Sequence, residues 1–473
     1  MRRPSGARAA TACRWCGWAR DSRLTTNEIL FCVFVWGVVG VLVYFATTSR
    51  QWCGVGLTLA FFLDMALLHW FSGMILILPW YTPLKYYATV DGFRMSTIGI
   101  GAFALGCFGI APLLTQRPSR VLSLRDSASD SRIFRIFLTV GIASFLLIGF
   151  GLGTIPTLSA VLSSGQGFLF VALGLGIWQS YLRQNRKQLL LFLSVTPAFP
   201  LLTIFVQGFL GFGVGYAIIV LCFFVSIYRP RVRTTLFIIP LAYLGLSFYV
   251  TYMRDRSALR AAVWGGSKIE TRVDQLISVV QHFEWFDPWD RQHLERVDVR
   301  LNYNWLVGAA MSHLQMTKGF GRGETLWMGV VTLVPRAIWP DKPIQTGSMD
   351  FVTRYAGVPV PEGTSMGMGL IFEFYANFGV YGVLMGMLVM GILVGFSDRK
   401  AGAELRWGSP IAFARWMLIG TFLLIVGGTL IEIIPGIVLS VIWTTGLKHL
   451  CGESFATNGS QSTPAPDIDA SYS

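Results

Sequence analysis

The sequence predicts an all-α polytopic membrane protein, a bundle of 11 or 12 transmembrane helices with a large, mostly helical periplasmic loop before the last three helices. Three observations predict this class. Of the 473 residues, 53% are hydrophobic and 13% are charged, about half the charged share of a typical soluble domain. The mean hydropathy is +0.57, and long apolar runs alternate with short basic stretches. Such a chain has too little polar surface for a soluble protein.

Each expected transmembrane element is an apolar run of about 20 residues, because a helix of that length satisfies its own backbone hydrogen bonds across the hydrocarbon core. Eleven such runs occur, at residues 29–46, 53–79, 95–114, 134–153, 160–182, 189–206, 208–228, 234–253, 378–397, 410–429 and 431–448.

Basic residues between the runs predict how the bundle is oriented. Four groups of cations lie at 117–132, 183–187, 229–233 and 399–406, and the intervening runs place all four on one side of the membrane. Lys and Arg are enriched in cytoplasmic loops, so this side is expected to be the cytoplasm and segment 254–377 to lie outside. The net charge of +13 then reflects topology, and no nucleic-acid partner is expected.

The N-terminal arm conflicts with this orientation. It is arginine-rich, as a cytoplasmic segment is, but three crossings before Arg117 place it outside. Either one more crossing lies between Trp52 and Arg94 or the arm is translocated; we expect the former, which gives twelve helices with both ends inside. The expected parts are a basic cytoplasmic arm (1–28), an N-terminal transmembrane bundle (29–253), an extracytoplasmic loop with the catalytic segment (254–377), C-terminal transmembrane helices (378–449) and a disordered tail (450–473).

The expected extracytoplasmic loop is far longer than an ordinary connection. It carries thirteen cations and, with Glu373, thirteen acids. Its six tryptophans argue against disorder, and it contains none of the seven cysteines, so no disulfide framework holds it. We expect a folded helical cap that partly dips into the bundle. Pro335 and Pro340 interrupt an apolar stretch there and prevent it from spanning as one helix.

Two motifs in this region carry a family resemblance. PRAIWPDKP, followed by TSMGMGLIFEFYANFGVYGVLMG, resembles the signature of bacterial oligosaccharide repeat-unit polymerases, the Wzy-type O-antigen polymerases. The matching residues are Pro335, Arg336, Trp339, Pro340, Lys342, Pro343, Thr364, Ser365, Glu373, Tyr375, Asn377, Phe378 and Gly379.

The resemblance implies an enzyme of the bacterial inner membrane. Such a polymerase transfers a growing glycan from undecaprenyl diphosphate onto the non-reducing sugar of another lipid-linked repeat unit, at the periplasmic face, without metal or cofactor. The product is O-antigen, capsule or exopolysaccharide. The expected partners are the lipid-linked donor and acceptor, the bilayer, and a chain-length regulator and flippase.

Three residues are expected to carry the chemistry. The leaving lipid diphosphate gains negative charge in the transition state. Arg336, held between two prolines, and Lys342 are expected to stabilise that charge. Glu373 enters an apolar helix, where an ionisable group suggests function, and it is the expected proton acceptor.

Further residues are expected to bind substrate. Arg254 and Arg256 lie where an apolar run meets the outer face, at a suitable height for a lipid-borne phosphate, although snorkelling to the interface explains them equally simply. An Arg followed by ten residues and Gly, a spacing described in the family, occurs at Arg336–Gly347 and Arg254–Gly265. The full expected set is Arg254, Arg256, Arg322, Arg354, Trp339, Tyr375 and Asn377.

The sequence also permits other interpretations of one segment and of the function. HFEWFDPWDRQH, at 282–293, offers carboxylates and histidines for a divalent cation, or tryptophans that stack on sugars or anchor at the interface. An O-antigen ligase uses the same lipid-linked donor but transfers glycan to lipid A core. A lipid-linked oligosaccharide flippase would instead need a charged cavity through the bundle.

Overall fold

The fold is entirely helical over the residues that the structure describes. This structure is a computed structural model, and it describes residues 22–115, 127–152, 156–231, 236, 238–265, 269–334, 338–339, 341–342, 348–360 and 367–451. Every regular element in these ranges is a helix, as the sequence predicts. Apolar runs without a water-facing side adopt helices because a helix satisfies its own backbone groups.

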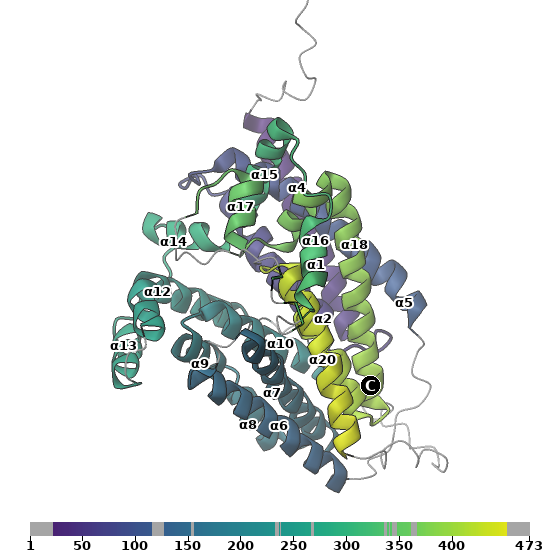
Figure 1. Ribbon diagram of the computed structural model, residues 1–473. Helices are drawn as coiled ribbons and strands as arrows, with labels where there is room; N and C mark the ends of the chain where they lie inside the picture. Colours follow the sequence, from purple (N-terminus) through teal and green to yellow (C-terminus); the bar gives the residue numbers. More distant parts are fainter. Residues whose placement is uncertain are drawn as a thin grey trace, which may run out of the picture.

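Two groups of helices build the molecule (Figure 1). The first group forms the bundle: α1 Ser22–Thr48, α2 Leu57–Met65, η1 Ala66–Trp70, α3 Phe71–Ile75, α4 Tyr86–Ala104, η2 Leu105–Ile110, α5 Ala111–Leu114, α6 Ser127–Gly149, α7 Pro156–Leu182, α8 Arg186–Ser194, α9 Ala198–Gln207, α10 Leu210–Tyr228, α12 Ile238–Trp264, α18 Leu370–Arg406, α19 Pro410–Leu423 and α20 Leu430–Cys451. The second group lies between α12 and α18: α13 Ile269–Gln281, α14 Arg291–Leu301, α15 Asn304–Thr317, α16 Glu324–Thr332 and α17 Ser348–Ala356. We call α14 to α17 the cap.

Within the described residues, nine helical stretches are long and apolar enough to cross a membrane: Thr26–Thr48, Leu57–Ile75, Tyr86–Leu114, Ser131–Gly149, Leu158–Leu182, Arg186–Val206, Leu210–Tyr228, Leu370–Arg406 and Leu430–Leu450. All nine correspond to expected runs. The other two expected runs form helices that are not among the nine. Pro410–Leu423 is apolar but short, and α12 continues beyond its apolar part through Arg254, Asp255, Arg256 and Arg260.

One end of the bundle is tied together by Asp398, a buried residue of α18. Its Oδ1 accepts hydrogen bonds from the backbone N–H groups of Val55 and Leu57, at 2.7 and 3.0 Å. Its Oδ2 accepts from Trp52 Nε1 and Thr58 Oγ1, both at 2.9 Å. A carboxylate that accepts four hydrogen bonds from one segment fixes the turn between α1 and α2 against α18.

Asp398→Asn is therefore expected to destabilise the protein strongly. The amide presents an NH₂ group to two donors and leaves them without an acceptor in a buried site, which costs about 3 kcal/mol in the free energy of unfolding. Thermal unfolding in detergent is the measurement. Lys400→Gln, two residues further along α18, is the control and should unfold like the unmodified protein.

The cap packs on the opposite end of the bundle, and close approach of backbones holds it there. A Cβ added at Gly92 of α4 would lie 1.8 Å from the carbonyl oxygen of Asn304, and one at Gly308 of α15 would lie 1.9 Å from that of Ala88. Glycine at both positions thus permits α4 and α15 to touch along their length.

The start of α1 lies at the same end as the cap. Glu28 forms an ion pair with Arg94 of α4, two residues beyond the Gly92 contact. Between Trp52 and Arg94 the chain is fully described and holds Leu57–Ile75 and the beginning of Tyr86–Leu114, so the further crossing expected in this stretch is not found. The arm 1–21 itself and the tail 452–473 lie outside the described residues.

Helix α18 is broken near its start by the Asn-Phe-Gly part of the motif. Phe378 has φ −138° and ψ 17°, and Gly379 has φ +61° and ψ −145°, a conformation that is essentially restricted to glycine. The break frees carbonyl groups of the preceding turn. Those of Ala376 and Asn377 accept instead from the N–H groups of Gly321 and Arg322, at 2.9 and 3.1 Å.

The side chain of Asn377 completes this connection. Its Oδ1 accepts from the N–H of Gly323 at 2.9 Å, and its Nδ2 donates to Thr325 Oγ1 at 2.7 Å. The turn before α16 is thereby docked onto the break in α18. The Asn and Gly of the motif thus have a structural role, which is to join the cap to the bundle.

Gly379→Ala is expected to lower the free energy of unfolding by about 1–3 kcal/mol, because alanine is strained at this φ and ψ. The melting temperature in detergent measures the effect. Gly446→Ala in α20 is the matched control, since a Cβ at Gly446 meets nothing within 4 Å and alanine favours a helix. Equal melting temperatures for the two variants would contradict this account of the break.

Candidate functional site

The first motif lies mostly outside the described residues. Arg336, Pro335, Pro340, Pro343 and Gly347 are among those not described, as are Thr364 and Ser365 of the second motif. Lys342 is buried, and its Nζ donates to the carbonyl oxygens of Thr332 and Val334 at 3.1 and 2.9 Å. It therefore neutralises the carbonyl end of α16. Trp339 is partly exposed, at 40%.

Glu373, the expected proton acceptor, is fully buried in the first turn of α18. Its Oε2 accepts from the N–H of Leu430 at 2.8 Å, so this carboxyl caps the start of α20. A negative group at a helix N-terminus is favourable. The neighbouring Tyr375 is also buried; it packs on Phe320 and hydrogen-bonds to Gln315.

The other predicted cations of the cap lie on its surface. Arg322 is exposed and adopts a φ of +47° in the turn before α16. Arg354 pairs with Glu324 at 2.8 Å, and the same carboxylate accepts from the hydroxyl of Tyr355 at 2.6 Å. The hydrogen bond from Arg354 to Glu324 raises the pKa of that guanidinium.

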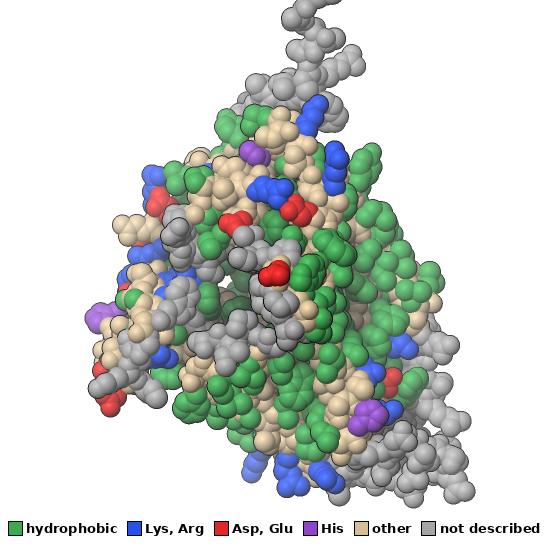
Figure 2. All heavy atoms as spheres, viewed as in Figure 1, with side chains coloured by type: hydrophobic (Ala, Val, Ile, Leu, Met, Phe, Trp, Pro, Cys, Tyr) green, Lys and Arg blue, Asp and Glu red, His purple; other side chains and the backbone are tan. Residues whose placement is uncertain are grey.

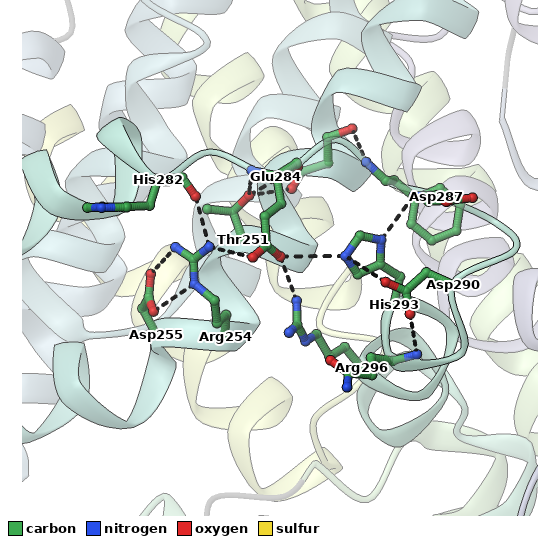
Figure 3. A network of polar contacts seen from close by, with 12 residues as sticks. Thr251, Arg254, Asp255, His282, Glu284, Asp287, Asp290, His293 and Arg296 are labelled. Carbon is green, nitrogen blue, oxygen red and sulfur yellow. Dashed lines mark hydrogen bonds and ion pairs between the residues drawn. The ribbon is translucent and has the colours of Figure 1, made fainter.

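Arg254 is engaged in a network of opposite charges (Figure 3). It binds Asp255 at 2.6 Å and Glu284 at 2.6 Å, and Glu284 is also bound by Arg296 at 2.8 Å. These arginines hold the pKa of Glu284 below its ordinary value against the opposing effect of burial. The positive charge of Arg254 is thus largely compensated within the protein, which makes it a poor contact for a further anion.

Arg256, two residues further along α12, belongs to a cluster of like charges. Arg260 follows it by one helical turn, and Arg300, at the end of α14, acts electrostatically on both. Burial and then the charge of Arg256 lower the pKa of Arg260 to about 10 and also lower the pKa of Arg300. We call Arg256, Arg260 and Arg300 the arginine cluster. Guanidinium groups remain charged in such surroundings, so these three positive charges make the cluster a candidate site for an anion.

A tyrosine lies within electrostatic reach of both the arginine cluster and a carboxylate on α20. Tyr303 interacts electrostatically with Arg300 and with Glu432. Burial, assisted by the charge of Glu432, raises the pKa of Tyr303 to about 12. Glu432 lies in the first turn of α20 and is exposed, whereas Glu373, with which it also interacts, is fully buried.

One face of the protein is hollowed. Figure 2 shows this face hollowed between the helices on the left, where Figure 1 places α12, and the region where α20 begins. Apart from this hollow, the arginine cluster offers positive charge to an anion, and Glu432 offers an exposed carboxylate. Chemically, this suits a reaction in which an anionic group leaves and a hydroxyl loses its proton.

In the segment 282–293, His293 Nε2 lies 3.5 Å from Glu284 Oε2 and 3.7 Å from Asp290 Oδ2, but these groups are engaged within the protein. Glu284 is bound by two arginines, as described above. His293 Nδ1 accepts from the N–H of Asp287, and Asp290 Oδ1 accepts from the N–H of Gln292. Across the described part of the chain, no three His, Cys, Asp or Glu side chains come together as a possible metal site.

Sequence reasoning identified Arg256 but missed Arg260, Arg300, Tyr303 and Glu432. Two signals were present. Arg260 follows Arg256 at the i,i+4 spacing that places both on one helix face. Glu432 lies within the apolar run 431–448, where an ionisable side chain suggests function by default. No local pattern connects Arg300 to either one, because α14 reaches α12 only through the tertiary fold.

Comparison with family models places the chain in a family. The model of a domain of unknown function, DUF8712, matches residues 85–451. The protein belongs to this family. The matched region begins just before α4 and includes the cap, the arginine cluster and Glu432. No curated protein and no solved structure matches the chain.

Proposed function

We propose that this protein is an oligosaccharide repeat-unit polymerase of the bacterial inner membrane. It joins undecaprenyl-diphosphate-linked units into O-antigen, capsule or exopolysaccharide. The observation that carries the proposal is the arginine cluster at the cap end of an apolar helical bundle, together with an exposed carboxylate, Glu432, that interacts with the same tyrosine as Arg300 does. The resemblance of residues 335–379 to the polymerase signature supports the same reaction.

The reaction assigns a task to the arginine cluster and another to Glu432. A hydroxyl oxygen of the acceptor sugar attacks the anomeric carbon of the donor glycan, and the bond from that carbon to the diphosphate oxygen breaks. The diphosphate departs with the bonding electrons, and the arginine cluster stabilises the charge that develops on it. Bidentate guanidinium contacts suit phosphate oxygens. No metal or cofactor is required.

The hydroxyl proton needs an acceptor, and Glu432 suits this role better than Glu373. Glu373 is fully buried and caps α20, so a sugar hydroxyl has no approach to it. Glu432 is exposed and lies within electrostatic reach of Tyr303, on which Arg300 also acts. Glu373 acts in this scheme by fixing the start of α20, and hence the position of Glu432.

The orientation follows from the chemistry of the substrate. Polymerisation takes place at the periplasmic face, so the cap is periplasmic and the Asp398 end is cytoplasmic. Arg399, Lys400 and Arg406 lie at the Asp398 end, as the enrichment of cations in cytoplasmic loops requires. Arg336 remains a predicted contact of the diphosphate. A chain-length regulator and a flippase are the proposed protein partners.

The test is transfer in liposomes that contain the purified protein and lipid-linked repeat units. Polymerase activity lengthens the glycan on the lipid by whole repeat units, which mass spectrometry resolves. Transfer only onto added lipid A core would indicate a ligase, and relocation of the lipid without a change of bonds would indicate a flippase. Either outcome would contradict the proposal.

A further inference from the structure

Two tryptophans far apart in sequence form a stacked pair at the cap end. Trp80 lies between α3 and α4, and Trp289 lies just before α14. Their ring centroids are 5.8 Å apart and their planes differ by 15°. The rings remain 49% and 72% exposed. Exposed large aromatic rings that are held in one orientation offer a flat apolar surface to a ligand.

The backbone holds this pair rigidly. Trp80 Nε1 donates to the carbonyl oxygen of Pro288 at 2.9 Å. Asp287 Oδ1 accepts from the N–H of Trp289 at 2.9 Å, which closes a local turn. Asp290 caps α14 through its contact with Gln292 at 2.8 Å. A preorganised aromatic surface loses little entropy when it binds a ligand.

The polar surroundings distinguish this pair from a membrane anchor. Trp289 is flanked by Asp287 and Asp290, and Glu295 lies one turn into α14. Carboxylates accept hydrogen bonds from sugar hydroxyls, whereas the anionic headgroups of a membrane surface repel them. Trp285 differs, because it stacks on Tyr243 in the apolar part of α12, a setting that suits the aromatic belt of a bilayer.

Helix α14 connects the pair to the arginine cluster. Trp289 lies directly before its first turn and Arg300 in its last. The helix has 11 residues, which at about 1.5 Å per residue separates the two sites by roughly 16 Å. A lipid-linked oligosaccharide has its diphosphate at one end and its sugars extending from it, so it matches this separation of a cationic site from an aromatic one.

We infer that Trp80 and Trp289 form a carbohydrate-binding subsite for the glycan of the lipid-linked substrate. This inference rests on the proposed function. The sugars lie against the exposed ring faces, with Asp287 and Asp290 as acceptors for hydroxyl groups, while the diphosphate lies at the arginine cluster. Specificity for a particular glycan then resides at the start of α14, away from the reacting bond.

Binding of two lipids to the full-length protein tests the inference. One probe is the lipid-linked oligosaccharide isolated from the source bacterium, and the other is undecaprenyl diphosphate without sugar. Trp289→Ala is expected to weaken binding of the first about tenfold and to leave binding of the second unchanged. Trp289→Phe should retain most of the affinity. Trp285→Ala is the matched control and should not alter the ratio of the two affinities.

Two outcomes would overturn the subsite. Equal weakening for both lipids in Trp289→Ala would assign the pair to membrane anchoring, and unchanged affinity for both would remove it from recognition. Failure of the proposed function is distinguishable from either one. In that case the unmodified protein does not lengthen the lipid-linked glycan in liposomes, whatever the tryptophan variants bind.

Discussion

Arg300→Gln is expected to lower the rate of glycan elongation by at least about 100-fold, because it removes a preorganised positive charge from the site where the diphosphate departs. Arg256→Gln should have an effect of similar size. The double variant should show a smaller reduction in elongation rate than the product of the two single reductions, since both arginines act on one anion. Single-turnover elongation in liposomes measures the rate, and the melting temperature verifies the fold.

Arg291→Gln is the matched control for Arg300→Gln. Arg291 lies on the same helix, is 75% exposed and pairs with Glu295 at the surface, so its loss should change the rate by less than about twofold. If Arg291→Gln lowered the elongation rate as much as Arg300→Gln does, the rate would depend on the total charge of α14. The arginine cluster would then have no special part in catalysis.

Glu432→Gln is the second change with a large expected effect. Glutamine is close in shape but cannot accept the proton, and loss of a general base typically reduces the rate by about 100-fold to 10,000-fold. Glu373→Gln should instead stay within about tenfold of the unmodified rate, because its amide oxygen can still accept from the N–H of Leu430. Elongation rates of the two variants, measured at saturating substrate, separate these roles.

The opposite pattern would reassign the chemistry. Loss of turnover in Glu373→Gln with an unchanged melting temperature, together with normal turnover in Glu432→Gln, would make Glu373 the proton acceptor. The exposure of Glu432 would then have no catalytic meaning. Both side chains lie next to the start of α20. The elongation rates of Glu373→Gln and Glu432→Gln can therefore be compared without a correction for distance from the cap.

The helical class and most of the bundle could be predicted from the sequence. A long apolar run can cross a bilayer as a helix, because a helix satisfies its own backbone hydrogen bonds. The nine apolar helices coincide with nine of the eleven expected runs. Helix α12 was less predictable, since its apolar part ends near Met253 but the helix continues to Trp264. Its last turns carry Arg256 and Arg260, which are therefore presented on a rigid helix rather than on a loop.

The site was less accessible to sequence reasoning. The resemblance drew attention to Glu373, Asn377 and Gly379, and these residues connect elements of the fold: Glu373 caps α20, and Asn377 and Gly379 dock the turn before α16. A motif records which residues recur together but not whether they touch a substrate. The partners of Arg256 come from α14, and only the tertiary fold brings that helix to α12.

The sequence also does not show which arginine charges are paired with carboxylates in the fold. Arg254 and Arg256 are equivalent by position, two residues apart at the end of an apolar run. The fold gives Arg254 two carboxylate partners at 2.6 Å, whereas Arg256 adds its charge to those that act on Arg260 and Arg300. A guanidinium paired with two carboxylates offers an anion little electrostatic attraction, so Arg254 is a weaker candidate contact than its position in the sequence suggests.

Native mass spectrometry of the purified protein with undecaprenyl diphosphate tests most directly whether the arginine cluster holds the lipid carrier. We expect that the unmodified protein and Arg291→Gln retain the bound lipid, and that the Arg256→Gln and Arg300→Gln double variant loses it while keeping its melting temperature. Equal retention of the lipid by all three proteins would contradict the account.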